Sequence, residues 1–250
     1  MTLSLYGQGK DFGKEASTSV SIYPGRWANL EYRSGPKLSI EVGQTGLSKP
    51  QAALFIGAGM SADAGLLTWP ELLRGVAKEL NLDVDKETDL VSLAQFHYNE
   101  TRVRTRLNRL IVDEYGKDVP VTTNHHLLAS LPIETVWTTN YDPLIEKAFQ
   151  EAGKRCDVRI SKGNFSSPPR GKDVTIYKMH GDVSQAHDAT LIKDDYEIYS
   201  TKNLAFTTAL SGDLVTKTFL FLGFSLTDPN MDYILSRIRL LMGQDAQQHY

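Results

Sequence analysis

The chain has 250 residues, of which 41% are hydrophobic, so it can bury the core of one large α/β domain, with or without an appendage. Its formal net charge of −3 argues against a broad basic surface for nucleic acid. The single cysteine, Cys156, excludes an intramolecular disulfide and a zinc site built from cysteines.

The sequence also predicts where the chain resides. The N-terminal stretch MTLSLYGQGKDFGKE lacks the basic start and the continuous apolar segment of a signal peptide. No apolar run reaches the length of about 18 residues that a membrane-spanning helix needs. We therefore expect a cytoplasmic chain that does not enter a membrane.

Residues 1–50 differ from the rest of the chain, because they are rich in glycine, serine and lysine and carry few long apolar runs. Short alternating segments at residues 19–23 and 37–42 could form strands. The sequence leaves open whether this part is a partly ordered extension or a small β unit. We expect residues 51–250 to form the main domain.

The main domain begins with a predicted buried strand at residues 52–57, where the apolar run AALFIG is stopped by glycines. A helix is predicted to start inside the following segment, GMSADAG. Helical periodicity then predicts further helices at residues 71–80, 88–100, 101–115 and 124–131. The first three of these constitute a predicted helical insertion, residues 71–120.

Strands and helices alternate in the second half of the chain. Strands are predicted at residues 133–140, 156–160, 174–179 and 219–224. Helices are predicted at residues 143–153 and 229–243, each with a proline in its first turn and a glycine at its end. This alternation favours an α/β fold with a doubly wound, Rossmann-like parallel sheet, into which the helical module is inserted.

A glycine-rich loop follows the first predicted strand. Residues 57–62, GAGMSA, fit the pattern G-x-G-x-x-[G/A] between a strand and a helix. In that pattern the first glycine permits a tight turn, the second lets a pyrophosphate approach the backbone, and the small last residue lets the helix pack closely. An ordinary tight turn explains the same residues. The acidic ribose ligand of dehydrogenases is not evident downstream, so this is not an ordinary dehydrogenase half.

A second polar element, TTNYD at residues 138–142, follows a buried strand and should lie at the carboxyl edge of the sheet, where ligands bind. Asn140 can both donate and accept hydrogen bonds, and Asp142 can accept them from a carboxamide. The simpler alternative is a turn in which Asp142 caps the helix that begins at Pro143.

Two more strand ends carry residues that suit a ligand site. His180 and Gly181 follow the strand at 174–179, so His180 could face a ligand and take a proton near neutral pH, although a lone histidine is more often structural. Gly223 and Ser225 follow a strongly apolar strand. Gly223 would permit close approach of a ligand, and Ser225 could bond to a phosphate or a ribose.

Together and in this order, the four elements resemble the sirtuin signature. The sirtuin phosphate loop G-A-G-x-S, with a further glycine four residues on, is matched by Gly57, Ala58, Gly59, Ser61 and Gly65. The sirtuin elements T-Q-N-x-D, H-G and G-[TS]-S-L are matched by Thr138, Asn140, Asp142, His180, Gly181, Gly223, Ser225 and Leu226. The resemblance extends over residues 51–250.

Two features of sirtuin deacetylases are missing. The D-F-R element after the phosphate loop is replaced by Leu67-Thr68-Trp69-Pro70. The two C-x-x-C pairs that bind structural zinc are absent, because no cysteine follows Cys156, so we expect no metal. The chain therefore resembles the sirtuin-like NAD hydrolases of bacterial anti-phage defence, which lack the zinc module.

The resemblance implies that NAD is the substrate and that the products are nicotinamide and ADP-ribose, or a cyclised form. It implies that Asn140 orients the attacking water or the ribose hydroxyls, and that His180 is the general base. The residues expected to bind NAD are Gly57, Ala58, Gly59 and Ser61 at the pyrophosphate, Asp142 at the nicotinamide carboxamide, and Gly223 and Ser225. NAD-dependent protein deacylation and non-catalytic sensing of NAD or ADP-ribose remain as alternatives.

An unrestrained NAD hydrolase would deplete its own host, so we expect a restraint that a trigger releases. The helical insertion, self-assembly into a homo-oligomer and a partner or sensor module are candidates, and nucleic acid would be involved only through such a partner. In a doubly wound fold a helix such as 229–243 normally leads to another parallel strand. We therefore expect the chain to be truncated at its C-terminus, as part of a longer protein or assembly.

Overall fold

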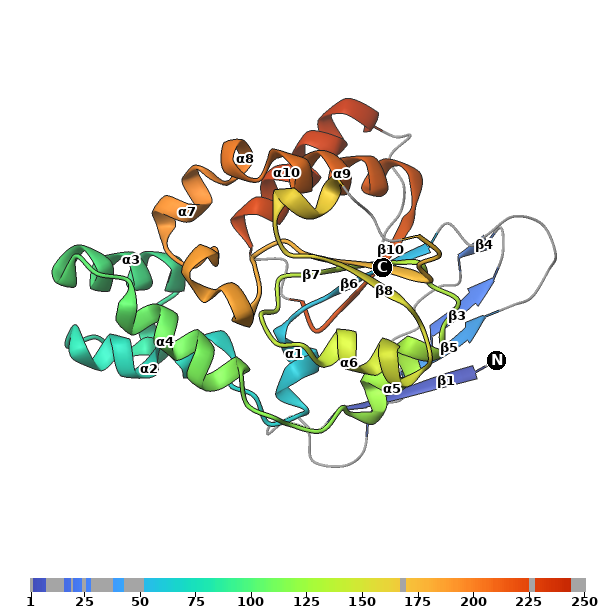
Figure 1. Cartoon of the computed structure of the whole chain (residues 1–250), viewed down its shortest axis with the longest axis horizontal. Coiled ribbons are helices and arrows are strands. Elements are labelled where there is room, and N and C mark those ends of the chain that lie inside the picture. Colours follow the sequence, from blue (N-terminus) through green and yellow to red (C-terminus); the bar gives the residue numbers. More distant parts are fainter. Residues whose placement is uncertain are drawn as a thin grey trace.

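The computed structural model describes residues 52–166, 170–224 and 228–243, together with the backbone of five short strands between Thr2 and Val42 (Figure 1). These five strands are β1 Thr2–Gly7, β2 Ala16–Thr18, β3 Val20–Tyr23, β4 Arg26–Trp27 and β5 Leu38–Val42, in the order β2-β1-β5-β3-β4. β3 and β5 coincide with the two segments that the sequence marks as strands. The division of the chain into domains stays a prediction.

The main domain is built on a five-stranded sheet in the order β10-β6-β7-β9-β8, in which every pairing is parallel. Its strands are β6 Ala52–Ile56, β7 Thr135–Thr138, β8 Cys156–Arg159, β9 Val174–Lys178 and β10 Thr218–Leu222. Four of the strands lie inside a segment predicted to be a strand, and β10 begins one residue before its predicted segment at 219–224, so the predicted parallel α/β architecture is confirmed. β10 and β8 are the edge strands of the sheet as described.

Helices cover both faces of this sheet (Figure 1). The alternation along β6 sends Leu54 and Ile56 to the face covered by α5 and α6, and Ala53 and Phe55 to the face covered by α9 and α10. The bounds of these helices are α5 Thr123–Ser130, α6 Leu144–Glu151, α9 Leu204–Thr216 and α10 Pro229–Met242. Burial on both faces explains why the strands read as continuous apolar runs, and it confirms the doubly wound arrangement.

A separate group of helices, α2 Trp69–Glu79, α3 Leu90–Thr101 and α4 Thr105–Tyr115, packs around its own apolar core (Figure 1). This core includes Leu73, Val76 and Ile111, and it reaches the main domain at Tyr141 and Leu144. The helix predicted at residues 101–115 begins later, at Thr105. Arg102 ends α3 in the left-handed conformation, with φ of 58°, and so interrupts the helical path.

Several short elements were not predicted. They are η1 Val84–Lys86, η2 Lys162–Phe165, η3 Val183–Asp188, α7 Lys193–Glu197 and α8 Tyr199–Lys202, and α9 was missed with them. The short helix α1 Ala58–Ala62 lies inside the predicted segment after β6. The segment from η3 to α9 carries the chain from β9 across to β10 at the opposite edge.

The sheet order places a topological switch at β6. The chain leaves β6 for β7 on one side, and later returns from β9 to β10 on the other side. The loops after β6 and β10 therefore meet at one point on the carboxyl edge, where Gly59 N donates to Gly223 O over 2.9 Å. Ligands of open α/β sheets bind at such a point.

Candidate active site

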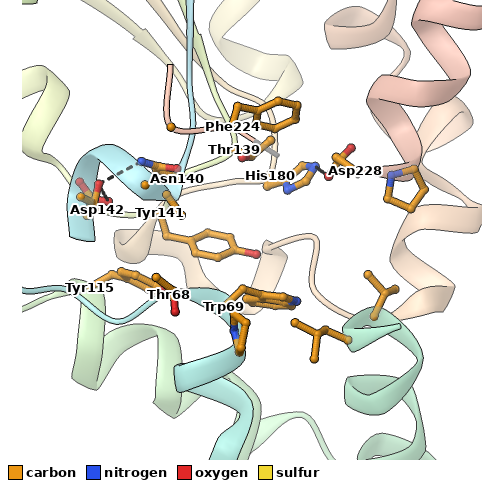
Figure 2. A pocket seen from close by; sticks show the side chains of 18 of the residues that line it. Thr68, Trp69, Tyr115, Thr139, Asn140, Tyr141, Asp142, His180, Phe224 and Asp228 are labelled. Carbon is orange, nitrogen blue, oxygen red and sulfur yellow. Dashed lines mark hydrogen bonds and ion pairs between the residues drawn. The ribbon is translucent and has the colours of Figure 1, made fainter. Parts of the chain in front are cut away.

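A cavity of about 660 Å³ opens at the carboxyl ends of β6, β7, β9 and β10 (Figure 2). Seven of the nine site residues expected from the sequence line it: Ala58, Gly59, Ser61, Asn140, Asp142, His180 and Gly223. Gly57 is not among the lining residues, but its carbonyl accepts a hydrogen bond from Asn140, which is. Ser225 lies outside the described residues. Four separate strand ends thus contribute to one cavity.

The glycine loop is shaped by contact with the loop after β10. Gly57 N donates to Leu222 O and Gly59 N donates to Gly223 O, each over 2.9 Å. A Cβ on Gly57 would lie 2.4 Å from Gly223 O, which is far inside van der Waals contact. Gly223 itself has φ of 61°, a conformation that favours glycine. The glycines are therefore required by the junction of two strand ends, and their contact with a pyrophosphate stays a prediction.

Gly57→Ala is expected to lower the free energy of unfolding by about 1–3 kcal/mol, because the new methyl group collides with backbone rather than with a movable side chain. Gly212→Ala is the matched control, since Gly212 lies within α9 and has open space around its Cβ position. That change should be neutral or stabilising. Urea titration of both variants checks this, and equal stability of the two would contradict the tight junction.

Asn140 is held by its amide nitrogen. Its Nδ2 donates to Gly57 O over 3.1 Å and to Ser61 Oγ over 3.0 Å. The Gly57 carbonyl can only accept, so the amide nitrogen must face it and Oδ1 must point the other way. Oδ1 is buried and has no hydrogen-bond partner among the described residues. Because such an orphaned acceptor costs about 1–3 kcal/mol, it suits a ligand hydroxyl or a water.

Ser61 and Asp142 complete this network beneath the cavity. Ser61 Oγ donates to Asp142 Oδ2 over 2.8 Å, so its only hydrogen is already used. Asp142 Oδ1 accepts from Leu144 N over 3.1 Å, which is the turn-capping arrangement that the sequence offered as the simpler alternative. The two residues therefore orient Asn140 in this structure. Their predicted contacts with pyrophosphate and carboxamide are not tested by it.

His180 follows β9 and is almost fully buried. Its Nε2 lies 3.3 Å from Asp228 Oδ2, and its ring meets Tyr196 and Tyr199 edge-on, with centroid distances of 5.4 and 6.0 Å. Burial lowers the pKa of His180 below its ordinary value, and the nearby Asp228 and Asp195 offset only part of this shift. A histidine kept neutral in this way can accept a proton near neutral pH.

Aromatic side chains that were not predicted form the rest of the wall. Trp69 and Tyr115 come from the helical module, and Tyr141 and Phe224 come from the main domain (Figure 2). Tyr196, from α7, also lines the cavity. Tyr141 Oη donates to Thr190 O over 2.7 Å, which fixes its ring. A planar apolar surface of this kind suits an aromatic ligand. Tyr141 and Phe224 lie within two of the sequence motifs, but at positions where the residue does not match the sirtuin pattern, and Trp69, Tyr115 and Tyr196 lie outside the motifs.

Lys178, the last residue of β9, was also missed. Its side chain is completely buried, and Nζ donates to the carbonyls of Tyr141 and Asp142 over 3.1 and 2.7 Å. Nζ also pairs with Glu146 over 2.8 Å and with Asp182. Burial acts to lower the pKa of Lys178, but the two carboxylates outweigh it and raise the pKa. Lys178 thereby fixes the loop that carries Asn140. The sequence signal was a lysine ending an apolar strand.

Among the described residues, no group of three or more histidine, cysteine, aspartate or glutamate side chains is arranged to hold a metal ion. Cys156 is a free thiol whose pKa is raised by burial to about 11, so it is a poor zinc ligand at neutral pH. We predict that the purified chain carries no stoichiometric zinc. Elemental analysis that finds one zinc per chain would contradict this expectation.

No helix in the described part of the chain is long and apolar enough to span a membrane.

Comparisons with known proteins find similar sequences. Residues 134–250 match the SIR2-like domain family. The NAD(+) hydrolase ThsA of Acinetobacter baumannii is 54% identical over 204 residues, which are 82% of this chain and 42% of that protein. The NAD(+) hydrolase ThsA of Bacillus cereus is 53% identical over 80% of this chain and 42% of its own. Defense-associated sirtuin 2 of Bacillus subtilis is 25% identical over 75% of this chain and 19% of its own. The chain thus spans well under half of these relatives.

Proposed function

Because the chain belongs to the sirtuin-like family that carries the SIR2-like domain, we propose that it hydrolyses NAD at the bond between nicotinamide and ribose. The observation that carries this proposal is that Asn140, whose Oδ1 has no partner among the described residues, and His180, a buried base, both line one cavity. A domain that only binds NAD needs neither group. The names of the ThsA relatives, NAD(+) hydrolases, support the same reaction.

The cavity suits the nicotinamide end of the substrate. The rings of Tyr141, Tyr115 and Trp69 offer flat apolar surface to a planar pyridinium. A cationic ring is also attracted to the faces of tyrosine and tryptophan. Asp142, at the floor of the cavity, keeps lone pairs beyond the two that Ser61 and Leu144 use, and in this proposal it accepts from the carboxamide.

Cleavage proceeds through a state in which positive charge develops on the ribose ring as nicotinamide leaves with the electron pair of the broken bond. Asn140 Oδ1 holds a ribose hydroxyl or the attacking water in place, and His180 accepts the proton that the nucleophile releases. Water adds to the anomeric carbon, and the products are nicotinamide, ADP-ribose and a proton. No side chain forms a covalent bond to the substrate in this proposal. Positioning of the substrate and fixed charges therefore supply most of the rate acceleration.

NAD-dependent deacylation of lysine is the second candidate reaction, and one observation weighs against it. The segment that replaces the D-F-R element begins α2, where the capping box of Thr68 and Glu71 starts the helix and Trp69 enters the cavity wall. The helical module therefore occupies this side of the cavity with an aromatic ring.

Nicotinamide release from NAD, measured with and without an acetyl-lysine peptide, separates the candidates. We expect release that is equally fast in both cases. Release that requires the peptide would assign a deacylase instead. Saturable NAD binding in a calorimeter without any release would assign a sensing domain.

We further propose that the hydrolase acts as a regulated effector in anti-phage defence, in keeping with the name of the Bacillus subtilis relative. In this proposal the cytoplasmic chain is restrained until it assembles with copies of itself or with a partner. The helical module is placed to transmit such an event, because Trp69 and Tyr115 belong to α2 and α4 and line the cavity. NAD consumption that is already maximal in dilute chain without a partner would contradict the restraint.

A further inference from the structure

The ring of His180 has one nitrogen against a carboxylate from a distant part of the chain. Nε2 lies 3.3 Å from Oδ2 of Asp228, and the two side chains are 5% and 10% exposed (Figure 2). Nε2 is shielded from solvent and makes no hydrogen bond of good geometry to any described residue. The two atoms are close enough for an ion pair, but the angle at which they meet is not that of a hydrogen bond. Catalytic hydrogen bonds often have this loose geometry before substrate binds.

Asp228 cannot readily turn away from His180. Its Oδ1 caps α10, because it accepts from Asn230 N over 3.0 Å and from Met231 N over 3.1 Å. Pro229 occupies the first turn of that helix and fixes the backbone beside it. Oδ2 is left over, and it faces His180 and, at 3.5 Å, the hydroxyl of Tyr196. The hydrogen bonds that Oδ1 makes to α10 therefore also fix the position of Oδ2 beside His180.

The imidazole is confined as well. Tyr196 and Tyr199 meet it edge-on, and Thr190 N binds the carbonyl of His180 over 2.9 Å. With the ring fixed and Nε2 facing Asp228, Nδ1 is the nitrogen left for the cavity that His180 lines. The tautomer with hydrogen on Nε2 has its lone pair on Nδ1, and only that tautomer can accept a proton from the cavity side.

We propose that Asp228 is a positioning residue for the reaction, which fixes the Nε2–H tautomer of His180 so that Nδ1 acts as the base. This inference rests on the proposed NAD hydrolysis. As the water oxygen bonds to the anomeric carbon, one O–H bond of the water breaks and an N–H bond forms at Nδ1. The imidazolium so formed is stabilised by the Asp228 carboxylate, and the proton then passes to solvent. A carboxylate that orients a histidine base is a recurring device in enzymes.

Asp228→Asn separates this role from helix capping. Asparagine caps a helix about as well as aspartate, so Oδ1 can keep its bonds to α10. The amide nitrogen then replaces Oδ2 and presents a donor to Nε2. To accept this hydrogen bond, Nε2 must carry the lone pair and Nδ1 must carry the hydrogen. The ring then has no lone pair on the cavity side and cannot act as a base there. Asp83→Asn is the matched control, because Asp83 caps η1 by accepting from Asp85 N and does not line the cavity.

Nitrogen-15 NMR of labelled histidines reads the tautomer without any turnover. The His180 signal is assigned as the one lost in His180→Ala. We expect the Nε2–H form in the wild-type chain and in Asp83→Asn, and the Nδ1–H form in Asp228→Asn. An Nδ1–H form in the wild type would overturn the proposal, even if NAD hydrolysis itself were absent. Unchanged tautomer in Asp228→Asn would overturn it too.

The kinetic arm uses the same variants with NAD. We expect kcat of Asp228→Asn to fall by about 10²-fold, with little change in KM and in the unfolding midpoint. Asp228, Asp195, Tyr196 and Tyr199 are the titratable groups near the His180 ring. Because each of them can affect the pH dependence, the pH profile of kcat is compared between Asp228→Asn and Asp83→Asn. Activity of Asp228→Asn within threefold of an active wild type would contradict the assignment. An inactive wild type with the Nε2–H tautomer would count against the proposed function and leave the His180–Asp228 pair supported.

Discussion

His180→Ala and Asn140→Ala are each expected to reduce the rate of NAD cleavage by about 10²–10⁴-fold while the chain stays folded. The first removes the base. The second removes Asn140 Oδ1, a buried acceptor that has no hydrogen-bond partner among the described residues. Nicotinamide release under saturating NAD measures both effects. His187→Ala is the control, because His187 is an exposed histidine that does not line the cavity.

The pH dependence of the wild type should follow the lowered pKa of His180. The base works only when neutral, so activity should be constant above that pKa and fall as the pH drops through it. Because burial depresses the pKa, the fall should lie below the ordinary histidine value of about 6.5. Persisting activity in both folded variants, or an acid limb well above that value, would refute the catalytic assignment.

Lys178→Met is expected to lower the free energy of unfolding by about 3–5 kcal/mol, because it leaves the buried carboxylate of Glu146 and the partly buried carboxylate of Asp182 without their cation. It also removes both hydrogen bonds to the carbonyls of Tyr141 and Asp142, so NAD cleavage should fall even where the variant is folded. Chemical denaturation and nicotinamide release measure the two effects.

Lys147→Met is the matched control for Lys178. Lys147 lies on α6 and pairs at the surface with Asp118, whose side chain is 96% exposed. Exposed pairs of this kind often contribute nothing measurable, so this variant should behave as the wild type. Equal stability of the two lysine variants would mean that Lys178 does not hold the loop.

The sheet could be predicted from the sequence because both of its faces are buried. The apolar runs of β6 and β10 stand out, and glycines or prolines mark where the elements end. The segment from η3 to α9 could not be predicted in the same way. α7 and α8 are only five and four residues long, which is too short for a helical period to emerge. At Arg102 a non-glycine residue adopts the left-handed conformation, which no local pattern announces.

The location of a residue in the cavity was predictable where that residue closely follows a strand, as for Asn140 and His180, whose roles stay predictions. It was not predictable where a residue acts across the fold. Asp228 reads locally as a helix cap, and only the return of β10 beside β6 brings it to His180. Ser61 shows the opposite case, since the glycine pattern suggested a phosphate ligand, while its hydroxyl in the structure is bonded to Asp142.

Hydrolysis of NAD in water enriched in heavy oxygen, with products identified by mass spectrometry, tests the central claim most directly. The account predicts unlabelled nicotinamide and ADP-ribose that carries one heavy oxygen at the anomeric carbon, formed without any peptide. Cyclic ADP-ribose alone would leave the bond cleavage intact but assign the attack to the adenine ring instead of water. No loss of NAD, at any chain concentration or with any added acyl peptide, would contradict the account.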